Sequence, residues 1–169
     1  MLFRLGKRNS KTEQQKKESI DDLLKIKKKF STRDKDIFLK EAFEKLREYF
    51  QNALKKMDEK YSEIETDFAE IHKFKFLCKI YINGELENQC KIWVGGLVSS
   101  DSIAYAEGKF DINNDNSMND FFNIETNEYE IGFKLSNMWY VDTEFKNIEL
   151  LNNDQLALYV WRRFIKSIK

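Results

Sequence analysis

The sequence predicts an α+β protein in which an antiparallel meander of four or five strands is covered by helices. Apolar residues recur at intervals of seven between residues 39 and 71, which is typical of a long helix. From Lys73 onward the period changes to two, which is typical of strands, and the stretch 153–168 is again amphipathic with a helical period. Helices, then a run of strands, then one helix is the order of an α+β domain with the helices on one face of the sheet.

The 169 residues fit one domain preceded by a basic N-terminal arm. We assign residues 1–32 to the arm and a short helix, and residues 33–169 to a single α+β domain. This domain comprises a long helix over 33–72, a sheet over 73–142 and a C-terminal helix over 153–168. No apolar run reaches the roughly 18 residues of a membrane helix, and the apolar start is too short for a signal peptide. We therefore expect a cytoplasmic protein with no membrane span.

Helix starts are marked by capping patterns. Ser19 with Asp22 precedes an amphipathic stretch that ends near Phe30, and Ser31 then offers the N-cap of the long helix. The first half of that helix carries a heptad seam, which predicts either an oligomer or partner interface or packing against the sheet, and packing is favoured. After Met57 the seam drifts, as expected of a straight helix lying on a sheet. The seam consists of Leu39, Phe43, Leu46 and Phe50.

The first two strands are joined at Asn83-Gly84, which is a strong hairpin signal. A two-residue turn would place charged residues opposite the apolar face of the first strand. We therefore expect a three-residue loop with Gly84 in the left-handed conformation, which pairs Phe76 with Cys90. This register buries Cys78 and Cys90 on adjacent strands, either as a redox pair or as two small core residues, and a reducing compartment favours the second interpretation.

Later strands are predicted at about 102–110 and 128–136, with a short fifth strand at 138–141. Asn152 or Asn153 offers the N-cap of the last helix.

The segment DINNDNSMNDFF, residues 111–122, has two interpretations. Asp111, Asn113 and Asp115 occupy alternate positions, as the oxygen ligands of a calcium loop do, but Phe122 stands where the bidentate carboxylate belongs. The favoured interpretation is a loop of Asx turns in which Ser117 caps a helical turn over 118–122. We therefore expect neither a metal site nor a cofactor.

Charge is segregated along a chain whose net charge is zero. Residues 1–40 hold 13 Lys and Arg against 6 acids, whereas residues 101–154 hold 3 against 12. The basic end and the acidic middle are expected to attract one another, within one molecule or between copies. Specific nucleic-acid binding is not favoured, because the arm has one aromatic residue, Phe3, and no recognised binding signature.

Groups that could perform catalysis are sparse. His72 is the one histidine, and no glycine-rich phosphate-binding motif occurs. We therefore predict no catalytic residue and a protein that is not an enzyme; a small enzyme that uses His72 is kept as an alternative.

Four short motifs lie between Lys91 and Phe164: KIWVGG (91–96), SIAYAEG (102–108), DNSMND (115–120) and LALYVWRRFI (156–165). Together they make this segment resemble the C-terminal module of bacterial Toll/interleukin-receptor (TIR) domain proteins of antiphage signalling systems. The resemblance implies a recognition module for a ligand or a partner. The TIR domain itself is not evident in residues 1–90, so its NAD-cleaving activity is not implied.

The function that we predict is non-enzymatic recognition of a partner or ligand. A protein partner or self-association is favoured, a small-molecule ligand is a further candidate, and a helical oligomerisation or adaptor protein whose basic arm contacts nucleic acid or an acidic partner is the alternative. We expect the surface where the strand ends and the 111–120 loop converge, because exposed aromatics beside amides and hydroxyls suit recognition; core packing is the alternative for each aromatic. The predicted residues are Trp93, Tyr105, Ser117, Asn119 and Trp139.

Overall fold

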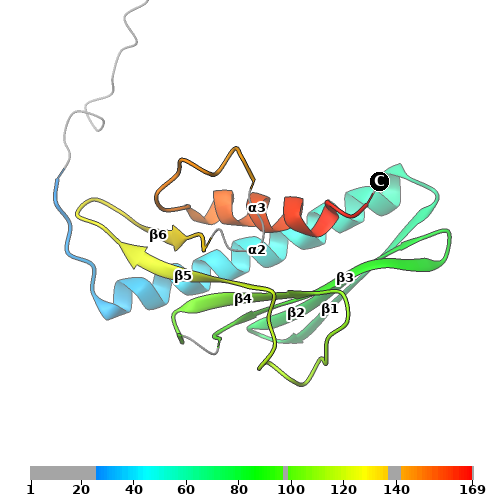
Figure 1. The fold of residues 1–169 in the computed structure, drawn as a ribbon, viewed down its shortest axis with the longest axis horizontal. Helices are drawn as coiled ribbons and strands as arrows, with labels where there is room; N and C mark the ends of the chain where they lie inside the picture. The colour runs from blue at the N-terminus through cyan, green and yellow to red at the C-terminus, as the bar shows by residue number, and fades with distance from the viewer. Residues whose placement is uncertain (1–25, 97–98, 137–141, 169) are drawn as a thin grey trace, which may run out of the picture.

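A computed structural model describes residues 26–96, 99–136 and 142–168, and shows two helices on one face of an antiparallel sheet (Figure 1). The strands pair with their sequence neighbours in the order β1 to β6, so the sheet is a simple meander. The predicted α+β class is confirmed, with six strands in the described ranges rather than four or five. The elements are α2 (Thr32–Lys60), β1 (Ile64–His72), β2 (Lys75–Ile82), β3 (Glu85–Val94), β4 (Ser102–Glu107), β5 (Asp120–Thr126), β6 (Ile131–Lys134) and α3 (Asn153–Ile165).

Helix α2 begins at the predicted cap. The Ser31 side chain accepts a hydrogen bond from the Asp34 N–H, and the Asp34 carboxylate accepts one from the Ser31 N–H, which completes a capping box. The helix ends at Lys60, however, and the predicted extent of 33–72 is wrong. Tyr61 adopts an extended conformation, and a strand starts three residues later.

The apolar residues of strand β1 fit both a helical and a strand period, so the sequence pattern alone does not identify this strand. Ile64 and Ile71 continue the interval of seven, but Ile64, Thr66 and Phe68 also alternate, and these three are the half-buried residues of β1. The drift of the seam after Met57 therefore marked the end of the helix. Strand β5 also differs from the prediction of a helical turn over 118–122. Ser117 is a local capping signal, but Phe122 and Ile124 alternate into the core as residues of a strand.

The hairpin between β2 and β3 keeps the predicted faces by a different route. Asn83 and Gly84 both have positive φ, 51° and 82°, so the turn has two residues rather than the predicted three. The register then shifts by one residue, which leaves Glu87 as a bulge and places Cys78 opposite Cys90. The predicted pairing of Phe76 with Cys90 is therefore wrong, because Phe76 lies opposite Ile92. Both cysteines are free and buried in the core, as predicted for small core residues, and burial raises the pKa of the Cys90 thiol.

The core lies between the sheet and the two helices, and the heptad seam of α2 forms its centre. The Phe50 ring lies 5.7 Å from the Phe76 ring and 5.2 Å from the Trp161 ring, measured between centroids. These contacts confirm packing on the sheet and correct the oligomer-seam prediction, because the seam is covered by its own chain. All four seam residues are buried: Leu39, Phe43, Leu46 and Phe50.

The C-terminal region closes the far edge of the sheet. The Phe133 N–H donates to the Leu151 carbonyl, and the Leu151 N–H donates to the Phe133 carbonyl, each at 2.9 Å. Gly132 makes this approach feasible, since a Cβ there would lie 2.7 Å from the Leu150 Cβ. Asn152 then caps α3 in a second capping box, which confirms one of the two predicted caps.

Other predictions differ in extent or lie elsewhere. The sheet spans 64–134 rather than 73–142, β4 ends at residue 107, β6 is shorter than 128–136, and α3 ends at residue 165. The predicted strand at 138–141 and the cap at Ser19 lie outside the described residues. The short helix predicted to end near Phe30 is wrong over its described part, because residues 26–30 are not helical. None of the helices within the described ranges is both long enough and apolar enough to cross a bilayer.

Candidate functional site

The loop between β4 and β5 covers the sheet face opposite the helices (Figure 1). It surrounds the ammonium of Lys91. Lys91 Nζ donates to the carbonyl oxygens of Asp111 and Asn114, at 2.9 and 2.8 Å, and to Asp115 Oδ1 at 3.1 Å. It also lies 4.5 Å from the centroid of the Trp93 ring. Lys91 is fully buried, so the loop is ordered around an internal cation.

Asp115 is shared between two lysines. Lys75 Nζ donates to both carboxylate oxygens, at 2.8 and 2.6 Å, while Lys91 approaches from the other side. Burial alone would raise the pKa of Asp115, but the hydrogen bonds from Lys75 and Lys91 outweigh it and hold that pKa below its ordinary value. Asp115 therefore stays ionised at neutral pH and neutralises part of the buried positive charge.

The Asx turns predicted for this loop are present. The Asn113 N–H donates to Asp111 Oδ1, and the Asn116 N–H donates to Asn114 Oδ1, both at 2.9 Å. The predicted helical cap at Ser117 is absent, because the chain runs into β5 instead. Within the described ranges, His, Cys, Asp and Glu side chains form no group of three or more that could hold a metal ion.

A second buried ion cluster fastens α3 to β4 and β5. Arg163 Nη1 donates to Asp120 Oδ2 at 2.5 Å, and Arg163 Nη2 lies 3.3 Å from Glu107 Oε1. The Tyr105 hydroxyl donates to Glu107 Oε2 at 2.7 Å, and the Ser136 hydroxyl donates to Asp120 Oδ1 at 3.1 Å. The cluster therefore joins three elements through charge-assisted hydrogen bonds.

Burial is the main cause of the pKa shifts of Asp120 and Tyr105 in this cluster. It raises the pKa of Asp120, although Arg163 acts in the opposite direction, and it raises the pKa of the Tyr105 hydroxyl well above its ordinary range. The Glu107 side chain is more exposed than its charged partners, at 31 % against 7 % for Arg163 and 4 % for Asp120. Because the acids and the guanidinium pair with one another, we interpret the cluster as structural rather than catalytic.

The four motifs that suggested a family resemblance meet in these two clusters. KIWVGG supplies Lys91, SIAYAEG supplies Tyr105 and Glu107, DNSMND supplies Asp115 and Asp120, and LALYVWRRFI supplies Arg163. The motifs therefore mark buried ion pairs that hold the loop and α3 in place.

The predicted recognition residues do not form one surface. Trp93 is 3 % exposed and packs on the outer face of the sheet with Ala104 and Met118, whereas Tyr105 is fully buried on the helix face. The expectation of exposed aromatics is corrected for both, and core packing is confirmed. Trp93 lies opposite Ala104, so Tyr105, the next residue of β4, points to the other face of the sheet. This relation can be stated only once the pairing of β3 with β4 is known.

The polar members of the set lie on the loop. Asn119 donates its N–H to the Tyr105 carbonyl and accepts from the Glu107 N–H through Oδ1, both at 2.8 Å, so it extends the pairing of β4. Ser117 and Asn119 are exposed, and Trp139 lies outside the described residues.

His72 has a structural contact at the end of β1. It lies at the turn between β1 and β2, is exposed, and accepts a hydrogen bond at Nδ1 from the Phe74 N–H at 3.2 Å. This contact stabilises the turn.

An apolar groove that sequence reasoning missed lies where α2 and α3 end. The groove encloses about 530 Å³, and both helices run toward it in the same direction (Figure 1). The apolar stripe predicted to continue to Ile168 is the signal in the sequence, since it extends beyond Ile165, where α3 ends. The groove is lined by Met57, Tyr61, Glu63, Ile64, Ile82, Trp161, Ile165 and Ile168.

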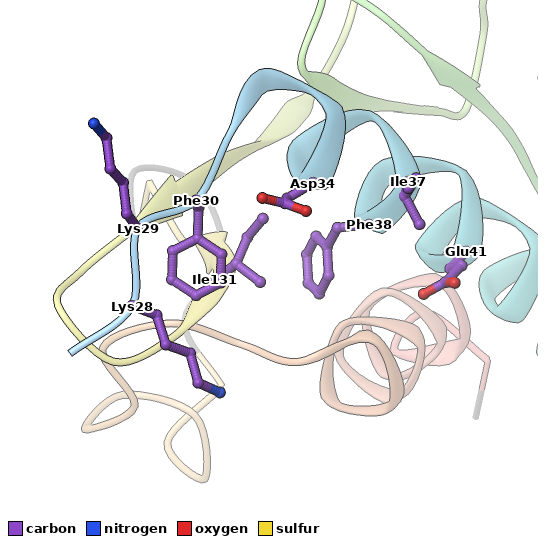
Figure 2. Close-up of a pocket in the computed structure, with 8 residues that line it drawn as sticks. All are labelled: Lys28, Lys29, Phe30, Asp34, Ile37, Phe38, Glu41 and Ile131. Atoms are coloured by element: carbon purple, nitrogen blue, oxygen red, sulfur yellow. The ribbon is translucent and has the colours of Figure 1, made fainter. Parts of the chain in front are cut away.

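A second hollow, of about 460 Å³, lies at the other end of α2 (Figure 2). Phe30, Phe38 and Ile131 form its apolar floor, and charged residues surround them. One of these, Asp34, is already committed to the capping box. The neighbouring segment is held by the Lys28 N–H, which donates to the Glu128 carbonyl at 2.7 Å.

Comparison with known proteins links the chain to one family. A family model described as the Y4lF protein domain matches residues 65–166, which is more than half of the chain. No curated protein and no solved structure matches the chain. The matched region contains both ion clusters, β2 to β6 and α3, and three of the residues that line the groove, namely Ile82, Trp161 and Ile165.

Proposed function

The chain belongs to the Y4lF protein domain family, and from this premise we propose that it is a non-enzymatic recognition module whose groove at the ends of α2 and α3 holds an apolar segment of a protein partner. The resemblance of residues 91–164 to modules of antiphage signalling proteins extends the proposal, since it would make that partner a component of such a system.

The lining of the groove is the observation that carries this proposal. Of its eight residues only Glu63 is charged, and Tyr61 is 44 % exposed to water. Half-exposed apolar side chains gathered in a hollow of this volume gain free energy when another apolar group covers them. By contrast, four of the eight residues that line the hollow of Figure 2 are charged.

The same lining favours a protein segment over a small polar ligand. Small-molecule sites combine apolar walls with several polar groups that orient the ligand. Here Glu63 and the Tyr61 hydroxyl are the main polar groups, whereas isoleucine, methionine and tryptophan side chains form the walls. One large aliphatic or aromatic side chain of a partner would complete the packing in the manner of an interface hot spot.

Two single substitutions test the groove. A protein retained from host extract by the immobilised chain is identified and purified, and its affinity is then measured by calorimetry. Tyr61→Ser and Ile168→Ser are each expected to weaken binding at least tenfold. Each removes an apolar side chain whose burial in the complex would contribute about 1.5–3 kcal/mol to the free energy of binding.

Ile37→Ser is the matched control, because Ile37 is also 44 % exposed but lines the hollow of Figure 2. It should leave the affinity unchanged, and all three variants should keep the circular dichroism of the parent. Equal affinity of the groove variants and the parent, or a loss confined to Ile37→Ser, would refute the groove as the binding site.

A further inference from the structure

We propose that the open edge of the sheet, strand β1, takes the chain's own basic segment, residues 2–8, as an added strand. Strand β1 is the first strand in the order of the sheet and pairs with β2 on one side. Residues 1–25 lie outside the described part of the chain, so the segment enters this argument through its sequence alone. The inference is independent of the groove and its partner.

At alternate residues of β1 the backbone N–H and C=O groups have no backbone partner among the described residues. The Asn83 N–H donates to the Glu63 carbonyl, so residues 63 and 83 form a hydrogen-bonded pair. In an antiparallel ladder such pairs alternate with pairs that point away from one another. With Ile64 opposite Ile82, the register assigns Glu65, Asp67 and Ala69 to bonds with β2. The N–H and C=O groups that point to the open edge are those of Thr66, Phe68 and Glu70.

Charge on this edge is strongly acidic. Glu63, Glu65, Asp67 and Glu70 are exposed and no lysine or arginine lies within β1. Glu70 pairs with Arg47 at 2.6 Å, but among the described residues no ion pair joins the other three acids to a cation. Acidic side chains on an open edge repel a second copy of the same edge and attract a basic strand.

The segment 2–8, LFRLGKR, carries three positive charges and matches both faces of β1. With strand alternation Phe3, Leu5 and Lys7 would share one face, and the other face would hold Leu2, Arg4, Gly6 and Arg8. One face of β1 holds the half-buried Ile64, Thr66 and Phe68, and the other holds Glu65 and Asp67. Strand addition therefore places Phe3 and Leu5 beside the apolar face and the arginines beside the acids.

The linker between residues 2–8 and the described part of the chain is long enough for the segment to pair with β1 of its own chain. Residues 9–25 can span about 55–60 Å when extended, which exceeds the roughly 43 Å length of α2. A segment tethered in this way has an effective concentration in the millimolar range, far above that of a second copy in dilute solution. Pairing within one protomer is therefore the arrangement that we expect.

Residue-resolved hydrogen exchange of the full chain by NMR tests the proposal. In the parent chain the amides of Thr66, Phe68 and Glu70 should be protected at any protein concentration. The variant Arg4→Gln/Lys7→Gln/Arg8→Gln should lose about threefold to tenfold of that protection, because it removes the two exposed ion pairs that Arg4 and Arg8 make with the acids, together with the positive charge of Lys7. The amides of Glu65, Asp67 and Ala69 serve as internal controls, because they already bond to β2 and should change less.

A charge-matched control removes three exposed lysines of α2 in Lys40→Gln/Lys55→Gln/Lys56→Gln, and it should preserve the protection. Unprotected edge amides in the parent, or equal protection in the two triple variants, overturns the proposal. Protection that appears only as the protein concentration rises also overturns it, in favour of pairing with a second copy.

Discussion

Lys91 shows how a single side chain decides the conformation of a loop. It stands between Cys90 and Ile92 on an interior strand and is fully buried. A buried ammonium without partners costs several kcal/mol, so the loop must supply them, and it does so with two carbonyl oxygens and the Asp115 carboxylate. The conformation of residues 111–115 thus follows from the burial of one charge.

The Asp115→Asn variant should therefore lose stability. It leaves the buried Lys75 and Lys91 without their carboxylate, and the free energy of unfolding, measured by urea titration, is expected to fall by about 1–3 kcal/mol. The loss is smaller than for a fully buried pair because the Asp115 side chain is 40 % exposed to water. Asp111→Asn is the control, because Asp111 binds Lys91 through its backbone carbonyl, and its side chain accepts an Asx-turn bond that asparagine can also accept. Equal losses in the two variants would contradict this account of the loop.

The contribution of Asp115 to the free energy of unfolding depends on pH, and the lowered pKa fixes the direction of this dependence. The pKa of Asp115 is lower in the folded protein than in the unfolded chain, where it is about 3.9. Its contribution to stability is therefore fully present above that value and is lost as the pH falls through the folded pKa. The acid limb of a stability profile should be shallower in Asp115→Asn than in the parent.

At the scale of elements, capping patterns were more informative than periodicity. Ser31 and Asn152 were predictable because an N-cap acts over three residues and depends on little else. The end of α2 was not, because Ile64 and Phe68 satisfy a helical and a strand period equally well. Their partners in β2 decide between the two, and those partners are set by the hairpin.

Strand β6 depends on a glycine for its contact with the segment before α3. In Gly132→Ala the new Cβ would lie 2.7 Å from the Leu150 Cβ and 2.8 Å from the Leu151 carbonyl oxygen. Overpacking against backbone of this kind is expected to cost about 1–3 kcal/mol and to lower the melting temperature by several degrees.

Gly96→Ala provides the comparison for this element. Its Cβ would approach the ends of the Met118 and Ser102 side chains at 3.3 Å, and such side chains can move. Its melting temperature should fall less than that of Gly132→Ala; the reverse order would show that β6 tolerates displacement.

At the scale of the whole molecule, α2 belongs to the core. Phe50→Ala should lower the free energy of unfolding by about 3–5 kcal/mol, because its ring packs between Phe76, Trp161 and Phe164. Ile37→Ala, on the exposed side of the same helix, should cost less than about 1 kcal/mol. A helix used as an oligomer seam would instead show a change of mass in light scattering with little loss of monomer stability.

The candidate site was harder to predict than the fold class. Binary patterning identified which residues of α3 and the strands are apolar, and hence the α+β arrangement. It could not tell that Trp93 and Tyr105 lie on opposite faces, nor that Met57, Ile82 and Ile165 meet at one groove, because both depend on contacts between residues distant in sequence. Recognition surfaces are products of topology, whereas periodicity is a local property.

The ammonium of Lys91 also changes how the β4–β5 loop responds to its surroundings. A loop that folds around a dissolved ion is ordered only when that ion is abundant, so its shape reports on the medium. Here the counter-ion is part of the polypeptide and its local concentration is constant once the sheet has formed. A dissolved cation would have to displace the covalently attached ammonium of Lys91. The loop should therefore keep one conformation in the folded state, whatever the concentration of cations in the medium.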